Sequence, residues 1–96
     1  MLKRIFNIPE TVPEKGRTYR APLYDCRNHE IHLWRVIPGE WIYPHIHPRT
    51  DDIWYLVQGN GVYYTTANET HAVASGDLML ASPEEVHGIF NSGAED

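Results

Sequence analysis

Two histidines separated by one residue, followed by a carboxylate, are the residues of this chain best suited to chemistry. His45 and His47 lie two positions apart, and Asp52 follows five residues after His47. Side chains at i and i+2 of a strand point to the same face, so imidazoles with this spacing can reach one ion together. A tight turn after His47 would bring Asp52 in from the next strand, and His87 would supply a fourth ligand from a distant segment.

Three imidazoles and a carboxylate favour one class of metal over another. Nitrogen-rich sites suit Zn, Fe, Ni, Mn or Cu, whereas Ca and Mg prefer oxygen ligands. The sequence therefore predicts one divalent transition-metal ion as cofactor. Asp51 precedes Asp52 in a turn, and either carboxylate is within reach of such an ion; the parity that Asp52 shares with Trp54 favours Asp52.

The segments that carry these residues are predicted to be short strands. Apolar and polar residues alternate in several segments that are separated by glycine- and proline-containing turns, and no segment keeps a helical period for more than about two turns. The predicted strands cover residues 30–37, 41–47, 52–57, 62–66, 71–74, 78–81 and 87–90, with a hairpin turn at 58–61 and a loop at 82–86. This pattern indicates an all-β jelly roll or small barrel.

Two segments resemble the paired signature of the cupin superfamily. In the first, GEWIYPHIHPRTDDIWYLVQG, the positions Gly39, His45, His47 and Gly59 match the pattern G-x5-H-x-H-x3,4-E-x6-G, and Asp52 stands where the family usually has Glu. In the second, from Gly76 to Asn91, His87 matches the pattern G-x5-P-x-G-x2-H-x3-N. Its proline lies one place late, at Pro83, and Glu84 replaces the inner glycine. These last two departures concern a turn and not a ligand.

The resemblance implies a double-stranded β-helix, the cupin barrel, as a single domain over residues 1–96 with a metal-site core at about 31–91. It also implies His45, His47, Asp52 and His87 as the ligands. Asn91 shares a strand face with His87 and Ile89, and we expect it to be a structural hydrogen-bonding residue and not a ligand. Asp52 is one methylene shorter than Glu, so its strand must approach the ion more closely or leave coordination to water. Cupins usually have a further strand after this Asn, and five residues follow Asn91 in this sequence, so the C-terminal edge is expected to be incomplete. We therefore expect either an open edge covered in a homodimer, with residues 3–8 contributing a strand, or a fragment of a longer protein.

Composition bounds the alternatives. A chain of 96 residues has room for one modest core. The formal net charge of −5 and the absence of any Lys or Arg run argue against nucleic acid or an anionic membrane as partner. The single cysteine, Cys26, is compatible with a reducing compartment, and residues 1–14 lack the long apolar run of a signal peptide or membrane span. We expect a cytoplasmic protein with a small-molecule ligand.

Residues beside the ligands supply candidates for binding and catalysis. Trp41 and Tyr43 share the parity of His45, so they are expected to line the pocket, and Arg49 lies in the turn beside the ligands. Structural packing and surface solvation are the alternative roles for these side chains. The substrate-binding candidates are Trp41, Tyr43, Arg49 and Trp54, and the candidates for a catalytic acid or base are Tyr43, His32 and Glu84.

An open divalent site can polarise a carbonyl, activate water or bind oxygen. The resemblance implies an enzyme acting on a small oxygenated metabolite, such as a sugar acid or an enolisable carbonyl compound, as an isomerase, lyase or dioxygenase. The alternatives are a binding module that senses or stores a small ligand or metal without turnover, and a scaffold with an incidental metal. Fold alone does not choose among these.

Overall fold

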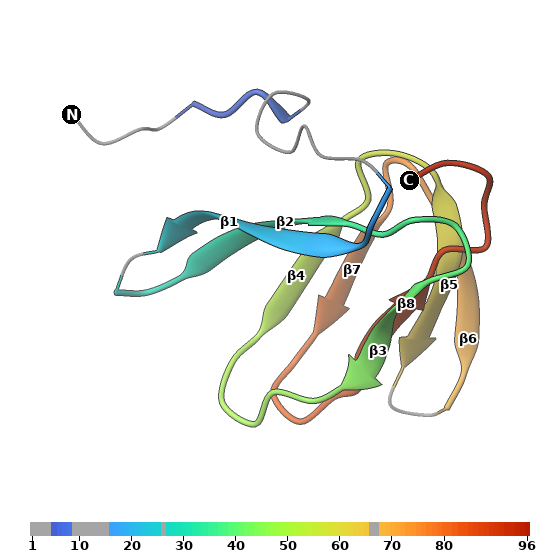
Figure 1. The fold of residues 1–96 in the computed structure, drawn as a ribbon. Helices are drawn as coiled ribbons and strands as arrows, with labels where there is room; N and C mark the ends of the chain where they lie inside the picture. Colours follow the sequence, from blue (N-terminus) through green and yellow to red (C-terminus); the bar gives the residue numbers. More distant parts are fainter. Residues whose placement is uncertain (1–4, 9–15, 26, 66–67) are drawn as a thin grey trace. The chain divides into compact units, whose positions relative to one another are not determined.

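The computed structural model describes residues 5–8, 16–25, 27–65 and 68–96 (Figure 1). Cys26 lies outside the described residues, as does the beginning of the predicted strand at residues 3–8, whose described part, 5–8, forms no strand. The chain divides into two units, Met1–Arg35 and Val36–Asp96, and each is described by itself. Among the described residues, no helix has the length and apolar character needed to cross a membrane.

The first unit contains an antiparallel pair of strands, β1 (Tyr19–Asp25) and β2 (Glu30–Arg35). Strand β2 confirms the expectation for residues 30–37, with an earlier end. Strand β1 is not predicted by the sequence pattern; Pro22 lies within it, and an internal proline lowers the signal for a strand. The pairing shifts register between Pro22 and Tyr24, which accommodates the missing N–H of proline.

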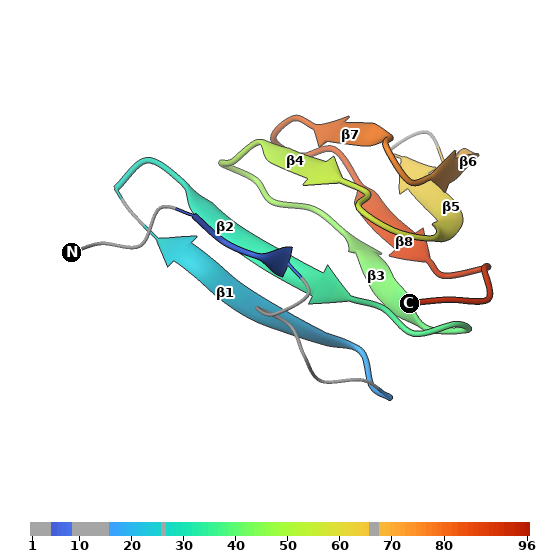
Figure 2. The same cartoon turned by 90° about the horizontal axis from the view of Figure 1, so that it is seen from above.

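The second unit is built from two sheets that face each other (Figure 2). One sheet has the order β3-β8-β5-β6 and the other pairs β4 with β7. The strands are β3 (Trp41–His45), β4 (Asp52–Tyr55), β5 (Asn60–Thr65), β6 (Thr70–Ala74), β7 (Leu78–Ala81) and β8 (His87–Phe90). Each of them matches a predicted strand, and the differences lie at strand ends, as for β3, which ends two residues early.

The core of this unit lies between the two sheets. Ile42, Tyr63, Met79 and Ile89 are buried there, and each comes from a different strand. Partly buried Trp54 packs against them from β4. Burying a large apolar side chain contributes about 1.5–3 kcal/mol, so this cluster is what holds the sheets face to face.

The glycines of the two motifs end strands and open turns. Gly39, Gly59 and Gly76 have φ angles of 83°, 87° and 97°, in the left-handed region that glycine adopts without strain. Two of these turns are tied together, because the Ser75 N–H donates to the carbonyl of Gly59 at 2.9 Å. The backbone conformation of these turns therefore explains why glycine occupies these positions of the motifs.

Asn91 closes the end of β8. Its Nδ2 donates to the carbonyls of Val36 at 2.7 Å and Glu95 at 2.8 Å, and its Oδ1 accepts from the Gly93 N–H at 2.9 Å. The side-chain amide of Asn91 is buried, and both its oxygen and its nitrogen are hydrogen-bonded. These hydrogen bonds connect segments of the chain that lie apart in the sequence. The predicted structural role of Asn91 is confirmed.

Candidate metal centre

Three imidazoles gather at the end of β3 and the start of β8. The ring centroids of His45 and His87 lie 4.2 Å apart, and His47 lies 4.9 Å from His45 and 5.0 Å from His87. Each residue offers one ring nitrogen, and these nitrogens all lie within 4.8 Å of one another. The fold therefore brings together histidines that are far apart in the sequence, and the cluster has the size of a site that could hold one metal ion.

An irregularity in β3 brings His45 opposite His87. Ile42 pairs with Ile89 and His45 pairs with His87, so three steps along β3 match two steps along β8. The extra residue is a β-bulge in the segment that contains Pro44, a residue that tolerates such a position because it has no N–H to pair. The bulge turns His45 to the same interior face as Ile42, which simple alternation would not do.

Gly88 makes this arrangement possible. A Cβ at Gly88 would lie 2.7 Å from both the Cα and the N of Pro44, closer than real Cβ contacts allow. The backbone of β8 thus approaches the bulge more closely than any side chain would permit. Gly88 lies next to His87 in the sequence, and its role is not visible there.

His87 is the most enclosed residue of the cluster. Its side chain is fully buried, at 0% exposure, and its Nδ1 contacts the carbonyl of Glu85 at 3.3 Å. With the proton on Nδ1, donated to that carbonyl, Nε2 presents a bare lone pair. That Nε2 is buried and finds no hydrogen-bond partner among the described residues. A buried polar atom without a partner costs roughly 1–3 kcal/mol, so its presence needs an explanation.

The electrostatics favour a neutral imidazole at this position. Burial lowers the pKa of His87 below its usual value, and the adjacent imidazoles His45 and His47 lower it further. The contact with the Glu85 carbonyl and the charge of Asp52 oppose this shift without reversing it. A neutral imidazole is the form that binds a metal ion.

Asp52 completes the cluster from β4. Its Oδ2 lies 2.8 Å from His47 Nδ1 and 3.5 Å from His87 Nε2. The first distance suits a hydrogen bond, but the second is too long for one, and with the proton of His87 on Nδ1 it joins two atoms that both carry lone pairs. Two ligands of one ion, each bonded at about 2.0–2.2 Å, lie roughly 3 to 3.6 Å apart. The side chains present therefore fit a cation held between them.

His45 is oriented by its own strand. Its Nδ1 lies 2.6 Å from the carbonyl of Tyr43, and a proton donated there leaves Nε2 free for a ligand bond. Metal-binding histidines are commonly fixed in this way by an oxygen acceptor on the other ring nitrogen. Of the two candidate carboxylates, the structure brings Asp52 to the imidazoles, whereas Asp51 is exposed.

Two aromatic side chains form the interior wall beside the cluster. The ring of Trp54 lies 5.4 Å from that of His87 and 5.9 Å from that of Tyr63, in edge-to-face geometry in both cases. Burial raises the pKa of Tyr63, and the negative charges of Asp52 and Glu85 add to that shift. Tyr63 is not among the predicted site residues. Its inward direction appears in the burial of Gly61 and Tyr63 along β5, and the sequence, with tyrosines at both 63 and 64, carries no signal that selects it.

Trp41 and Tyr43 lie on the opposite face of β3. The ring of Trp41 packs against those of Tyr43, Tyr64 and Phe90, at 5.9, 5.1 and 4.7 Å, and Tyr43 is 73% exposed. The expectation that shared parity would place these two residues beside His45 was wrong, because the bulge breaks the alternation between them. Their assignment as substrate-binding residues stays a prediction without that support.

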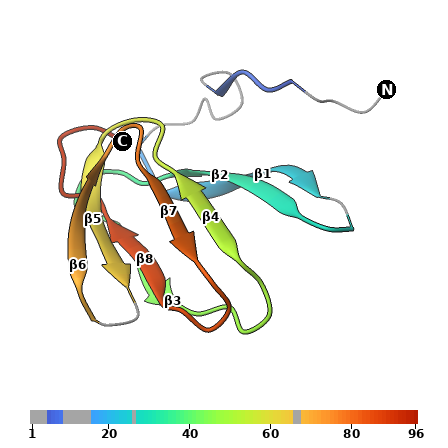
Figure 3. The same cartoon turned by 180° about the vertical axis from the view of Figure 1, so that it is seen from behind.

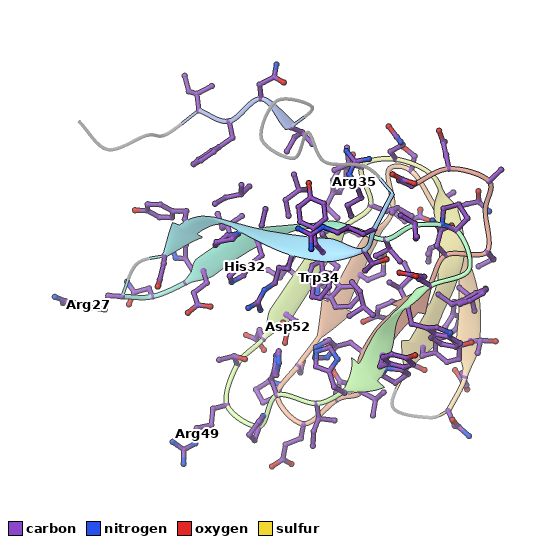
Figure 4. All side chains as sticks on the ribbon, in the orientation of Figure 1. Arg27, His32, Trp34, Arg35, Arg49 and Asp52 are labelled. Carbon is purple, nitrogen blue, oxygen red and sulfur yellow. The ribbon has the colours of Figure 1, made fainter. Side chains whose placement is uncertain are left out.

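The remaining candidates lie at the periphery or in the other unit. Arg49 is on the turn between β3 and β4, and its side chain points away from Asp52 (Figure 4). Glu84 is exposed and has a φ of 69°, and its N–H donates to the His47 carbonyl at 2.9 Å. His32 belongs to the first unit, where its Nε2 lies 3.2 Å from Glu30. A hollow of about 250 Å³ beside Asp52 is lined by Asp51, Asp52, Ile53, Leu80, Ala81 and Ser82.

Two facing sheets with a histidine cluster between strand ends define a double-stranded β-helix protein. Residues 32–96 match the family model described as the cupin domain. The chain belongs to the cupin family, as its motifs predict. No protein with curated function matches it.

Solved structures agree with this assignment. A conserved double-stranded β-helix protein of Klebsiella pneumoniae is 32% identical, with a TM-score of 0.88 over 98% of this chain and 83% of its own. A predicted oxalate decarboxylase of Thermotoga maritima is 25% identical, with a TM-score of 0.64 over 67% of this chain. The chain spans 55% of that protein. KdgF from Halomonas sp. is 24% identical, with a TM-score of 0.73 over 79% of this chain and 68% of its own, and shares the fold.

Proposed function

We propose that the protein binds one divalent transition-metal ion through His45, His47, His87 and Asp52, and that it acts there on a small oxygenated metabolite. The observation that carries the proposal is the buried Nε2 of His87, which lies 3.5 Å from the carboxylate of Asp52 and has no hydrogen-bond partner among the described residues. Both atoms gain a partner when a cation lies between them. The contacts of Nδ1 on His45 and His87 with backbone carbonyls support the same assignment.

The chemistry proposed follows from the class of site. A bound divalent ion with open positions supplies a Lewis acid that polarises a carbonyl or carboxylate oxygen. The chain's own part is to hold the ligand atoms, to exclude water with Trp54 and Tyr63, and to keep His87 neutral by burial. Sugar acids and enolisable carbonyl compounds are the substrates that such a site suits, in an isomerase, lyase or dioxygenase reaction. The description of the Thermotoga maritima relative as a predicted oxalate decarboxylase agrees with a small carboxylate as ligand.

A binding module without turnover is the second candidate. It is favoured by the placement of the predicted acids and bases, because Tyr43 faces away from the imidazoles and Glu84 is exposed. Arg49, on the turn between β3 and β4, would in either case have to turn its side chain toward Asp52 to attract a carboxylate ligand.

Elemental analysis of protein purified without added metal tests the site. We expect about one equivalent of a transition metal in the native chain, loss of the metal in His45→Ala and weakened binding in Asp52→Ala. His71→Ala, an exposed histidine whose ion-pair contact is with Glu69, is the matched control and should keep its metal. Full metal content in His45→Ala would refute the ligand assignment.

Turnover is tested separately on the metal-loaded protein. A panel of small hydroxy acids, keto acids and uronates is followed by NMR, with dissolved oxygen recorded in parallel. Consumption of one compound that is lost in Asp52→Ala supports the enzyme. Saturable binding of a compound with no product favours the binding module.

A further inference from the structure

The hydroxyl of Tyr63 is a polar group inside the core of the second unit. Tyr63 is 6% exposed and packs in one cluster with Ile42, Met79 and Ile89. A buried tyrosine hydroxyl usually finds a hydrogen-bond partner. In the described part of the chain, burial and the charges of two carboxylates act on this hydroxyl, and no hydrogen bond does. Phenylalanine would fill the same space without a polar atom, so the packing of the core does not explain the hydroxyl.

The carboxylates that act on Tyr63 lie at the end of the unit that holds the histidine cluster. They belong to Asp52, the first residue of β4, and to Glu85, which lies in the loop before β8. Figure 3 shows the starts of β4 and β8 at one end of the two sheets, and β5, the strand of Tyr63, also ends there. The Tyr63 hydroxyl is therefore within electrostatic reach of the candidate metal centre.

Strand register places Tyr63 one inward position away from the level of His87. On the paired strands β5 and β8, Tyr63 lies opposite Ile89 and Thr65 lies opposite His87. These two pairs are separated by roughly 6.8 Å along the strands, a distance that the long side chain of tyrosine largely covers. Trp54 contacts both rings edge to face, at 5.9 Å from Tyr63 and 5.4 Å from His87. Trp54 and Tyr63 thus line the side of the cluster that faces the core.

We propose that Tyr63 donates a hydrogen bond to an oxygen of the ligand at the metal centre and so selects small hydroxy and keto acids. The inference rests on the proposed function and specifies the ligand of that same site. In such an acid, one oxygen bonds the metal ion and a second oxygen lies on a neighbouring atom. The hydroxyl of Tyr63 is the donor that the barrel interior offers to the second oxygen.

Tyr63 acts in this role as a donor and not as a base. Burial raises its pKa, and Asp52 and Glu85 raise it further, since a phenolate would lie among like charges. The hydroxyl therefore keeps its proton. A neutral O–H in an enclosed site stabilises a partly charged oxygen strongly, because little water competes for the same bond. The side chain of Arg49 points away from Asp52 and does not supply this contact in the conformation observed (Figure 4).

Cobalt-loaded protein tests the inference, because the visible absorption of Co²⁺ reports both metal binding and ligand binding. Tyr63→Phe removes the hydroxyl and keeps the ring. Tyr64→Phe is the matched control, since it makes the same change at the next residue of β5, whose ring contacts Trp41. We expect the native protein and both variants to bind Co²⁺ equally well. Glycolate, a two-carbon hydroxy acid, should bind Tyr63→Phe at least about tenfold more weakly than the other two proteins. Imidazole, which bonds a metal ion through one nitrogen and offers no second acceptor, should bind all three equally.

Urea denaturation separates ligand recognition from a structural role. A hydroxyl without a partner in the protein does not stabilise the fold, so Tyr63→Phe should unfold at the same or a higher urea concentration than the native chain. A lower midpoint overturns the inference, because the hydroxyl is then structural. Glycolate affinity that is unchanged in Tyr63→Phe, or weakened together with imidazole affinity, also overturns it and leaves the metal site standing.

NMR of the native, zinc-loaded protein provides a measurement that needs no variant. Exchange of the Tyr63 hydroxyl proton with water should slow when glycolate saturates the site, and an unchanged rate overturns the inference. A native protein that binds the metal ion but no glycolate overturns it as well. A native chain that takes up neither Co²⁺ nor Zn²⁺ instead refutes the proposed function.

Discussion

Replacing His87 with leucine should change the stability of the protein in opposite directions with and without metal. Leucine has a similar volume and no polar atoms, so His87→Leu removes a buried Nε2 that lacks a partner and costs about 1–3 kcal/mol. The change also removes the contact of Nδ1 with the Glu85 carbonyl, a long contact at 3.3 Å worth at most about 1 kcal/mol. In the presence of a chelator, the free energy of unfolding should therefore rise by about 1 kcal/mol.

In the presence of metal, the native chain should have a higher free energy of unfolding than His87→Leu. A ligand at a hundred times its dissociation constant stabilises the native state by about 2.7 kcal/mol, and the variant lacks the ligand that makes this possible. The native chain should then be more stable than His87→Leu by about 2 kcal/mol, a difference of roughly 8–16 °C in Tm for a domain of this size. Urea denaturation followed by tryptophan fluorescence, in chelator and in saturating zinc, measures both values.

A control variant shows whether these stability changes are specific to the histidine cluster or follow from replacing any histidine with leucine. His71→Leu changes an exposed histidine whose contact with Glu69 is an ion pair at 3.5 Å, and its stability should stay within about 0.5 kcal/mol of the native value in both conditions. If His87→Leu were less stable than the native chain by about 2 kcal/mol or more in chelator, the imidazole would be a structural hydrogen-bonding residue and not a metal ligand. Retention of the metal-dependent gain in His87→Leu would refute the ligand assignment directly.

Three further outcomes follow from the same region. Gly88→Ala should weaken metal affinity at least about tenfold in a metal titration, although it changes no ligand, because its Cβ would lie 2.7 Å from the backbone of Pro44 and displace the bulge. Unchanged affinity would mean that the backbone can move to accommodate the Cβ without displacing His45. Glu84→Gly should raise the free energy of unfolding by about 0.5–1 kcal/mol in urea denaturation, because Glu84 has a φ of 69° that glycine adopts without strain; a loss of stability would contradict this. In chelator, stability should fall as the pH drops from about 6.5 toward the lowered pKa of His87, since the unfolded chain there binds a proton that the native state resists, and His87→Leu should show a shallower pH dependence.

Much of the fold is predictable because the strands keep a period of two over most of their length. The alternation of residues 52–57 places Trp54 and Leu56 on the inner face with Asp52, and the core packing of Trp54 and Leu56 confirms it. The positions of the motif glycines are predictable for a different reason. They fall at turns with positive φ, a backbone conformation that glycine adopts without strain. Alternation and turn residues together are therefore sufficient to locate the strands that carry the histidines.

What could not be predicted depends on register, which alternation does not encode. The bulge between Ile42 and His45 inverts the face of Trp41 and Tyr43, and nothing in the local pattern distinguishes a bulged strand from a regular one except Pro44. The close approach at Gly88 involves two strands that are far apart in the sequence, so its signal is a glycine with no turn to explain it.

Local departures from regular structure gather around the histidine cluster. Pro44 and its bulge turn His45 inward, Glu84 adopts a left-handed conformation while its N–H holds the His47 carbonyl, and His87 buries a nitrogen without a partner. The left-handed conformation of Glu84 and the unpartnered Nε2 of His87 each cost on the order of 1 kcal/mol or more in the chain alone. In the described part of the second unit, the other non-glycine residue with a positive φ is Asn68, at 61°, and asparagine tolerates this conformation. Local destabilising features that gather at one place are typical of a ligand-binding site. The free energy of ligand binding offsets their cost at that site and nowhere else in the protein. The coincidence is an argument for metal binding that does not depend on the motif, and it predicts that the apo protein will be measurably less stable than the metal-bound form.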